Sequence, residues 1–219
     1  TEAMLAALHA LLDPGDEVVV FEPFYENYGP DVLLAGGRIR PVPLRPPEWR
    51  LDVEALEDAF GVRTKAIVLN TPNNPTGKVF TRAELERIAA LCLRWDCYAV
   101  ADEIYEHILY GGAEHVSLAT LEGMADRTVT VNSASKTYSA TGWRIGWAIA
   151  SARITDRIRK VHDFATVGAP TPFQHAAAVA MASPPSYYRD LAERYRAARD
   201  LLVRALRECG FAVELPQGA

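Results

Sequence analysis

The chain has 219 residues, of which 49% are hydrophobic and 23% charged, and its formal net charge is −5. This balance is ordinary for folded globular proteins and excludes collagen-like, low-complexity and wholly disordered chains. No apolar run reaches the roughly 18 residues that a membrane span needs. The mild acidity provides no field to attract a polyanion, so we expect neither a membrane nor a nucleic acid as a partner.

Short apolar runs alternate with longer amphipathic segments along the whole chain. Asp52 is a plausible cap of the third helix, and Thr81 and Glu84 have the spacing of a capping box at the start of the fourth. The residues just before Pro216 also have the pattern of a strand. In chain order the pattern predicts helix 2–12, strand 18–21, helix 27–36, strand 38–44, helix 51–60, strand 65–69, helix 81–95, strands 98–101, 128–131 and 145–150, and helices 153–164, 172–182 and 186–209.

Near-continuous apolar strands that alternate with helices are typical of a parallel sheet covered on both faces. We therefore predict an α/β fold, a three-layer sandwich with a mostly parallel central sheet. Ligands of such sheets bind beyond the carboxyl ends of the strands. Polar residues gather after three predicted strands, at 70–77, 102–105 and 133–136. This convergence is the first indication of a functional site.

Several familiar motifs are absent or incomplete. There is no G-x-G-x-x-G, and the segment 76–78 lacks the first glycine and the Ser/Thr of a phosphate loop, because Pro72 and Val79 stand in those places. Ser133 and Lys136 have the S-x-x-K spacing of penicillin-recognising serine enzymes. The K-T-G and S-D-N elements of those enzymes do not follow, so a serine acyl-enzyme is only a distant alternative.

The cysteines and histidines indicate no metal site. Cys92, Cys97 and Cys209 form no C-x-x-C pair, and the five histidines are scattered without a ligand spacing. Reduced cysteines that serve as small hydrophobic residues are typical of a cytoplasmic protein.

The polar residues at the strand ends fit pyridoxal 5′-phosphate (PLP) better than any of these alternatives. This cofactor needs a lysine for a Schiff base, a carboxylate for its ring nitrogen, hydroxyl donors, a phosphate site and a flat partner for its ring. Lys136 supplies the amine, Asp102 the carboxylate, Ser133 and Ser135 the hydroxyls, and Arg144 a guanidinium for phosphate.

Each of these residues also has a purely structural interpretation. Asp102 could cap the turn that follows it, Arg144 could be an ordinary ion-pair residue, and 74–77 could be only a turn. The aromatic residues near the site could simply be packing residues: Tyr25, Tyr28 and Tyr105.

Four motifs in order resemble the class I/II, fold-type I aminotransferases, in particular the kynurenine, glutamine and methionine enzymes. They are N-T-P-N-N-P-T-G at 70–77, D-E-I-Y at 102–105, S-A-S-K-T at 133–137 and G-W-R-I-G at 142–146. The resemblance runs from residue 1 to residue 219. It implies the large PLP-binding domain of that fold.

The resemblance implies catalytic roles for Lys136, Asp102 and Tyr105, and a cofactor-binding role for Asn74. Lys136 would carry PLP as a Schiff base and move the substrate proton. Asp102 would pair with the ring nitrogen, while Tyr105 and Asn74 would hydrogen-bond the phenolic oxygen.

The same resemblance assigns the remaining contacts. Tyr25 would stack on the ring, and Ser133, Arg144 and Thr1 would hold the phosphate. Asn70, together with Asn74, would line the substrate side. Family members also have cis bonds before the prolines that match Pro23 and Pro75.

The resemblance also bears on domains and length. Residues 1–182 would form the PLP-binding large domain, and 183–219 a long helix and the start of a small C-terminal domain. Family members are longer, so we expect a fragment cut at both ends that lacks the arginine for the substrate carboxylate. This fragment alone would have little or no turnover. The full-length protein would be a homodimer.

The expected function is exchange of an amino group between an amino acid and a 2-oxo acid. A PLP-dependent C–S β-lyase and the aminotransferase-like effector domain of a transcription regulator remain alternatives, and only the latter would bring nucleic acid as a partner. The sequence leaves the amino donor open among kynurenine, methionine, glutamine, aromatic amino acids, aspartate and succinyl-diaminopimelate.

Overall fold

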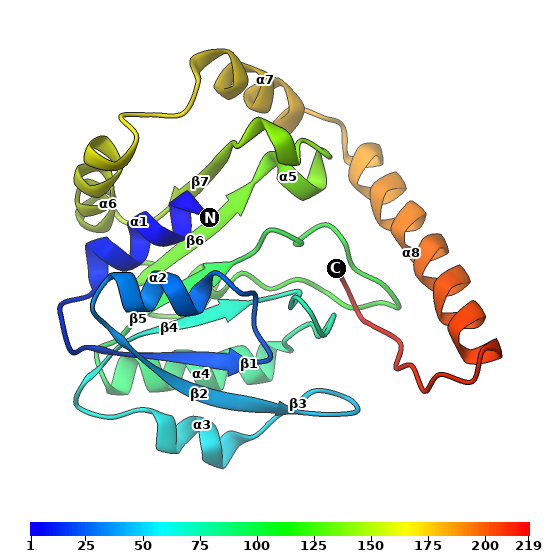
Figure 1. Ribbon diagram of the computed structural model, residues 1–219, viewed down its shortest axis with the longest axis horizontal. Coiled ribbons are helices and arrows are strands. Elements are labelled where there is room, and N and C mark those ends of the chain that lie inside the picture. The colour runs from blue at the N-terminus through cyan, green and yellow to red at the C-terminus, as the bar shows by residue number, and fades with distance from the viewer.

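A seven-stranded sheet forms the centre of the computed structural model, which describes residues 1–219 (Figure 1). Its spatial order is β3-β2-β1-β4-β5-β6-β7. The five inner strands are parallel, and the edge strands β3 and β7 are antiparallel to their neighbours. The prediction of a mostly parallel α/β sheet is thus confirmed. The strands are β1 (Glu17–Glu22), β2 (Arg38–Arg45), β3 (Arg50–Leu51), β4 (Thr64–Asn70), β5 (Tyr98–Asp102), β6 (Thr128–Ser133) and β7 (Gly146–Ile149).

Helices cover both faces of this sheet and continue beyond it. None of them combines the length and the apolar character needed to cross a membrane. The α-helices are α1 (Glu2–Leu11), α2 (Tyr28–Leu34), α3 (Val53–Ala59), α4 (Arg82–Arg94), α5 (Ala134–Thr137), α6 (Ala152–Ala165), α7 (Thr171–Met181) and α8 (Pro185–Glu208), and short 3₁₀ turns lie at Leu118–Thr120 and Thr141–Trp143.

The three layers follow from the alternation of side chains along buried strands. In β1, Val19 and Phe21 pack in a core cluster with residues of α3 and α4. Val18 and Val20 point to the opposite face and pack in a second cluster with α1, α2 and α6. Because both faces of β1 are covered, its sequence is continuously apolar rather than alternating.

The predicted caps form. Thr81 and Glu84 make both hydrogen bonds of a capping box at the start of α4, and the Asp52 carboxylate accepts from the Ala55 amide at the start of α3. The predicted start of helix 51–60 is wrong by two residues. Leu51 belongs instead to β3 and pairs with Leu44 of β2, because the polypeptide turns back beside β2 before the helix begins.

Lys136, which follows β6, lies on α5, because Ser133 caps a single helical turn there. One further expectation is corrected. The segment before Pro216, expected as a strand, forms no strand. The cis peptide bonds before Pro23 and Pro75 are present, and two more precede Pro47 and Pro72.

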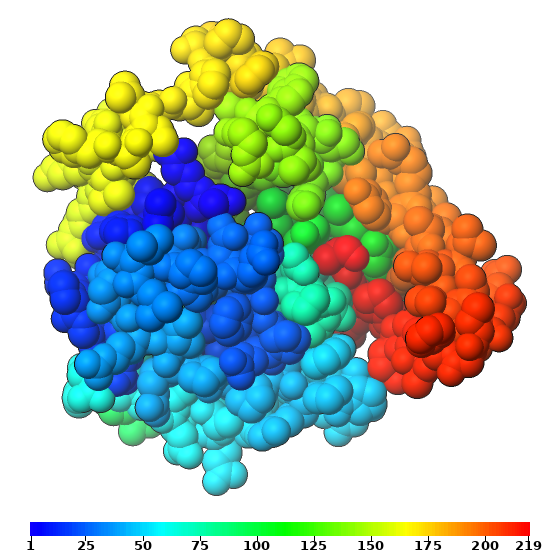
Figure 2. All heavy atoms as spheres, viewed as in Figure 1, coloured from blue at the N-terminus to red at the C-terminus, as the bar shows by residue number.

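The C-terminal segment 216–219 returns from α8 to the sheet. The Gln217 and Gly218 amides both donate to the Gly77 carbonyl oxygen at 3.0 Å, and the Tyr110 amide donates to the Gln217 carbonyl oxygen at 2.8 Å. In Figure 2 these residues, in red, lie between α8, in orange, and the cyan and green middle of the chain. The segment therefore fastens the long helix to the loop that follows β4.

The strand order reverses beside β1, and this reversal determines where a ligand can bind at the edge of the sheet. The chain proceeds from β1 to β2 on one side and then crosses to β4 on the other side. The connections that follow β1 and β4 consequently diverge, which opens a crevice at the carboxyl edge of the sheet.

Candidate active site

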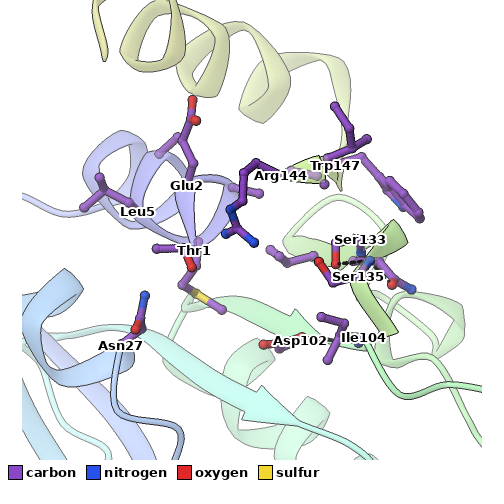
Figure 3. A pocket seen from close by; sticks show the side chains of 18 of the residues that line it. Thr1, Glu2, Leu5, Asn27, Asp102, Ile104, Ser133, Ser135, Arg144 and Trp147 are labelled. Carbon is purple, nitrogen blue, oxygen red and sulfur yellow. Dashed lines mark hydrogen bonds between the residues drawn. The ribbon is translucent and has the colours of Figure 1, made fainter. Parts of the chain in front are cut away.

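A cavity of about 580 Å³ lies at this carboxyl edge (Figure 3). It is bounded by the segments that follow β1, β4, β5 and β6, by the first residues of α1 and by α6. Every site residue expected from the sequence lines it: Thr1, Tyr25, Asn70, Asn74, Asp102, Tyr105, Ser133, Lys136 and Arg144. Residues far apart in the sequence thus line one cavity.

Asp102 supplies the acidic group of the cavity. It is the last residue of β5, and its Oδ2 accepts a hydrogen bond of 2.8 Å from the Tyr28 hydroxyl. Its Oδ1 accepts from the Ile104 amide at 3.2 Å, so the capping interpretation also holds in part. Burial raises the pKa of Asp102, while these two hydrogen bonds favour the ionised form and oppose that rise.

An asparagine pair fixes the loop after β4 to the end of β5. The Asn70 Nδ2 donates to the carbonyl oxygen of Asp102 at 2.9 Å, and the Asn70 Oδ1 accepts from the Asn74 amide at 2.7 Å. Asn70 is buried, so these bonds are shielded from water. The backbone of Asn74 is therefore held by the buried Asn70 side chain, which is itself anchored on the end of β5.

Lys136 is held by the turn that follows β6. The Ser133 Oγ accepts from the Ser135 amide at 3.1 Å, and the Ser133 amide donates to the Asn132 Oδ1 at 2.7 Å. These bonds start α5 directly at the end of the strand. The lysine consequently lies one turn beyond a buried strand, within the cavity wall.

A cationic end of the cavity is formed by Arg144 and the start of α1. Figure 3 shows the Arg144 guanidinium between Thr1 on one side and Ser133 and Ser135 on the other. Arg144 has a φ of 56°, and its Nη1 donates to the Thr141 carbonyl oxygen at 2.8 Å. Thr1 is the N-cap of α1, whose first amides have no partners within the helix. Guanidinium, hydroxyl and amide donors together are suited to an anion such as phosphate.

Three tyrosines also line the cavity: Tyr25, Tyr28 and Tyr105. The Tyr25 ring meets the Tyr28 ring edge to face, with centroids 5.8 Å apart. Burial and then the nearby Asp102 carboxylate raise the pKa of Tyr105, so its hydroxyl is neutral at ordinary pH.

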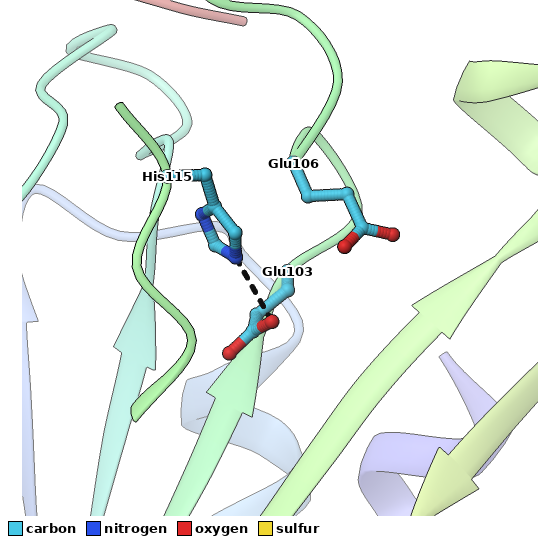
Figure 4. Close-up of side chains that lie close together, drawn as sticks. All are labelled: Glu103, Glu106 and His115. Atoms are coloured by element: carbon cyan, nitrogen blue, oxygen red, sulfur yellow. Dashed lines mark hydrogen bonds and ion pairs between the residues drawn. The ribbon is translucent and has the colours of Figure 1, made fainter. Parts of the chain in front are cut away.

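A polar cluster lies behind the site (Figure 4). The buried Glu103 carboxylate accepts from Ser117 at 2.8 Å and pairs with the His115 Nε2 at 2.9 Å. Glu106 accepts from the Asn132 Nδ2 at 2.6 Å. The Asn132 Nδ2 also donates to the Glu103 carbonyl oxygen at 3.2 Å. The cluster therefore connects Ser117 and His115 with Asn132, whose side chain accepts from the Ser133 amide.

Sequence reasoning missed several residues of the cavity wall, among them Tyr28, Asn27, Trp147, Arg159 and His162. The sequence indicates only a packing role for Tyr28, although it follows Tyr25 by three positions at the start of a predicted helix. Arg159 and His162 belong to α6, which reaches the cavity through packing alone. No sequence signal indicated them.

Comparisons with known proteins agree with this arrangement. The profile of the family "Aminotransferase class I and II" matches residues 1–219. Human kynurenine–oxoglutarate transaminase 1 is 40% identical over 99% of the chain. The structure of N-succinyldiaminopimelate aminotransferase from Mycobacterium tuberculosis superposes with a TM-score of 0.97 at 40% identity over 100% of the chain. The chain therefore belongs to the class I and II aminotransferase family.

A third relative widens the range of substrates within the same fold. YbdL from Escherichia coli, for which a methionine aminotransferase function has been identified, has a TM-score of 0.95 and 36% identity over 100% of the chain. The chain spans little more than half of these relatives: 56% of the human protein and 57% of the mycobacterial and E. coli chains.

Proposed function

We propose that the chain forms the cofactor site of a PLP-dependent aminotransferase that exchanges an amino group between an amino acid and a 2-oxo acid. One observation carries the proposal: a single cavity contains a lysine, an enclosed carboxylate and a cationic end. These are three of the groups that PLP requires. The lysine follows β6, the carboxylate ends β5, and the cationic end comes from the residues before β7 and the start of α1.

The chemistry of the donor set fits PLP. Arg144, Ser133 and the first amides of α1 would bind the phosphate, because each is a hydrogen-bond donor. Asp102 would bind the ring nitrogen, and Tyr105 with Asn74 would bind the phenolic oxygen. Tyr25 would cover the ring face, and Asn70 would border the substrate. When bound, PLP supplies an electron sink for the negative charge that develops on the substrate Cα.

The residues of the chain perform the proton chemistry around that sink. The Lys136 amine would act as the general base that takes the proton from the substrate Cα and later returns it. The Asp102 carboxylate would keep a proton on the ring nitrogen, since an anion in a low-dielectric site strongly favours a neighbouring cation. Asn70 and the loop it anchors would keep the substrate close to Lys136.

Aminotransfer is favoured over the alternative reactions. Each relative reported above bears the name of a transaminase or aminotransferase, whereas nothing in the cavity specifically supports β-elimination or a serine acyl-enzyme. Kynurenine, N-succinyl-diaminopimelate and methionine are substrates in the names of these relatives. We propose only their common class, an amino acid and a 2-oxo acid.

Three broader properties belong to the same proposal. We propose a homodimer, supported by exposed apolar side chains on α6, α7 and α8, and a cytoplasmic location, supported by three free cysteines. We also propose that residues 1–182 form the cofactor domain and that 183–219 lead into a second domain. The course of α8 away from the sheet supports this division (Figure 1).

The proposal is tested by adding PLP to the chain and recording the visible absorption band of lysine-bound cofactor. We expect the band to form and to disappear in Lys136→Ala. Lys160→Ala, which removes an exposed lysine of α6, and Ser133→Ala should both retain it. A band that persists in Lys136→Ala would contradict the proposal. A panel of amino donors that bleach the band would then define the substrate class.

A further inference from the structure

Tyr28 and Asp102 form a hydrogen bond that has no role in the chemistry proposed above. Tyr28 opens α2 and is 2% exposed, while Asp102 ends β5, 74 positions later in the sequence. The Tyr28 hydroxyl donates to the Asp102 Oδ2 at 2.8 Å, and both residues line the cavity. Tyr28 is thus the one side chain that donates a hydrogen bond to this carboxylate; the other donor is the Ile104 amide.

The surrounding charges fix the direction of this hydrogen bond. Burial, followed by the Asp102 charge, raises the pKa of Tyr28 well above its usual value, so the hydroxyl keeps its proton. The other titratable groups that act on the pair are Tyr25, Tyr105, Glu103 and the amino terminus of the chain. The amino terminus is the one cation among them, and it lowers the pKa of Asp102 less than the hydrogen bonds from Tyr28 and the Ile104 amide do.

The ring of Tyr28 is held in place independently of its hydroxyl. It meets Tyr25 edge to face and lies nearly parallel to Phe24, with centroids 6.4 Å apart. It also belongs to the core cluster between α1, α2 and the sheet. The packing therefore presents the hydroxyl to Asp102 in one orientation.

We propose that Tyr28 is a positioning residue: its hydroxyl orients the Asp102 carboxylate and favours its ionised form, so that the carboxylate retains a proton on the ring nitrogen of a bound pyridine cofactor. This inference rests on the proposed function. A donor on Oδ2 makes the carboxylate less basic, and a less basic carboxylate leaves the shared proton on the nitrogen. Without the donor, the proton moves toward Asp102.

The first experiment needs no cofactor. The carboxyl group of Asp102 is titrated by NMR in chains with ¹³C-labelled aspartate. Loss of a hydrogen bond to a charged group should raise the midpoint by about one pH unit in Tyr28→Phe, a tenfold change in the proton affinity. Tyr98→Phe is the matched control: Tyr98 lies on the same strand, and its hydroxyl accepts from Arg153 at 3.1 Å. Equal midpoints in the Tyr28→Phe and unmodified chains would overturn the inference.

A second substitution guards against a folding defect in Tyr28→Phe. Replacement of Tyr28 by 3-fluorotyrosine keeps the ring shape and makes the hydroxyl a stronger donor, so the midpoint should fall. A midpoint that does not respond to the stronger donor would overturn the inference on its own.

The second experiment uses PLP labelled with ¹⁵N in the ring. In Tyr28→Phe the nitrogen signal should move toward that of an unprotonated pyridine, and the dissociation constant of PLP should rise about tenfold. Tyr98→Phe should change neither quantity. In an Asp102→Asn background, Tyr28→Phe should cause no further shift of the nitrogen signal, because the carboxylate on which Tyr28 acts is gone. A merely structural role of Tyr28 would instead change the signal with or without the carboxylate.

The two experiments separate two kinds of failure. If PLP forms no lysine-dependent band with the unmodified chain, the proposed function fails, whereas the titration still decides whether Tyr28 controls Asp102. If the band forms but the nitrogen signal in Tyr28→Phe equals that of the unmodified chain, the inference fails while the proposed function stands.

Discussion

At the residue scale, Asp102 shows how a site residue lowers the stability of the chain that carries it. Its carboxylate is enclosed at the end of β5 without a cationic side chain among its hydrogen-bond donors. Burial raises its pKa, so the charged form is less favourable in the folded chain than in the unfolded chain. A bound cation would remove this cost, which gives the group its value in a binding site.

We therefore expect Asp102→Asn to stabilise the cofactor-free chain at neutral pH. The penalty is fully present above the folded pKa, and it vanishes as the pH falls through that value to the ordinary value of the unfolded chain, about 4. Urea unfolding at a series of pH values measures the difference.

Asp52→Asn is the control of opposite sign. The hydrogen bond from the Ala55 amide and the neighbouring Arg45 lower the pKa of Asp52. Its contribution is therefore stabilising above the unfolded value and is lost as the pH falls through the folded value. A loss of stability in Asp102→Asn at pH 8 would contradict our reading of that carboxylate.

A second prediction at this scale concerns Gly77. Its φ is +70°, and an added Cβ would lie 2.3 Å from the Pro216 Cβ and 2.8 Å from the Gly218 oxygen. Gly111 has a similar φ of +64° but open space around it. We expect Gly111→Ala to cost about 1 kcal/mol from backbone strain, and Gly77→Ala to cost about 1–3 kcal/mol more from the clash. The free energy of unfolding of the two variants gives the comparison, and equal losses would show that segment 216–219 does not press on Gly77.

At the element scale, helix starts can be compared directly. Thr81 accepts from the Glu84 amide at the start of α4, whereas Ser151 at the start of α6 makes no capping hydrogen bond through its side chain. Thr81→Ala should lower the free energy of unfolding by about 1 kcal/mol, and Ser151→Ala should leave it nearly unchanged. A similar loss of free energy of unfolding in both variants would indicate that the capping box does not cause the effect of Thr81→Ala.

The elements also show where sequence reasoning succeeds. Inner strands such as β4 and β5 are buried on both faces, so their apolar runs stand out in the sequence. The two-residue strand β3 is too short for any periodicity, and the apolar residues before Pro216 mimic a strand without a partner. The hydrophobic pattern therefore predicts strands whose burial shows in their own residues, but not strands that depend on pairing with a distant segment.

The candidate site divides in the same way. Lys136, Asp102 and Asn74 occur in short motifs and could be found directly from the sequence. The Tyr28–Asp102 hydrogen bond joins residues 74 positions apart, and it exists only because α2 packs on the sheet beside β1. Contacts of that kind depend on tertiary packing, and no short motif in a single sequence indicates which distant residues will meet.

At the scale of the whole molecule, α6, α7 and α8 expose large apolar side chains. Phe164 is 95% exposed, Val179 76% and Leu201 67%. Exposed apolar area of this extent is typical of surfaces that associate, which agrees with the proposed homodimer.

We expect Phe164→Lys to raise the dissociation constant of the dimer about tenfold, the order expected when one buried phenylalanine is lost from an interface. Val62, 92% exposed between α3 and β4, provides the control Val62→Lys. Sedimentation equilibrium measures both. Equal association of the two variants would place the interface away from α6.

The fastening of segment 216–219 has a mechanical consequence. Arg199 on α8 donates to the Pro216 carbonyl oxygen at 3.0 Å. The Gln217 and Gly218 amides donate to the Gly77 carbonyl oxygen, and the Gly77 amide donates to the Asn73 carbonyl oxygen. A displacement of α8 would therefore move Pro216 and, through the Gln217 and Gly218 amides, the Gly77 backbone in the loop that carries Asn74. The long helix is thus coupled by hydrogen bonds to a loop that lines the cavity.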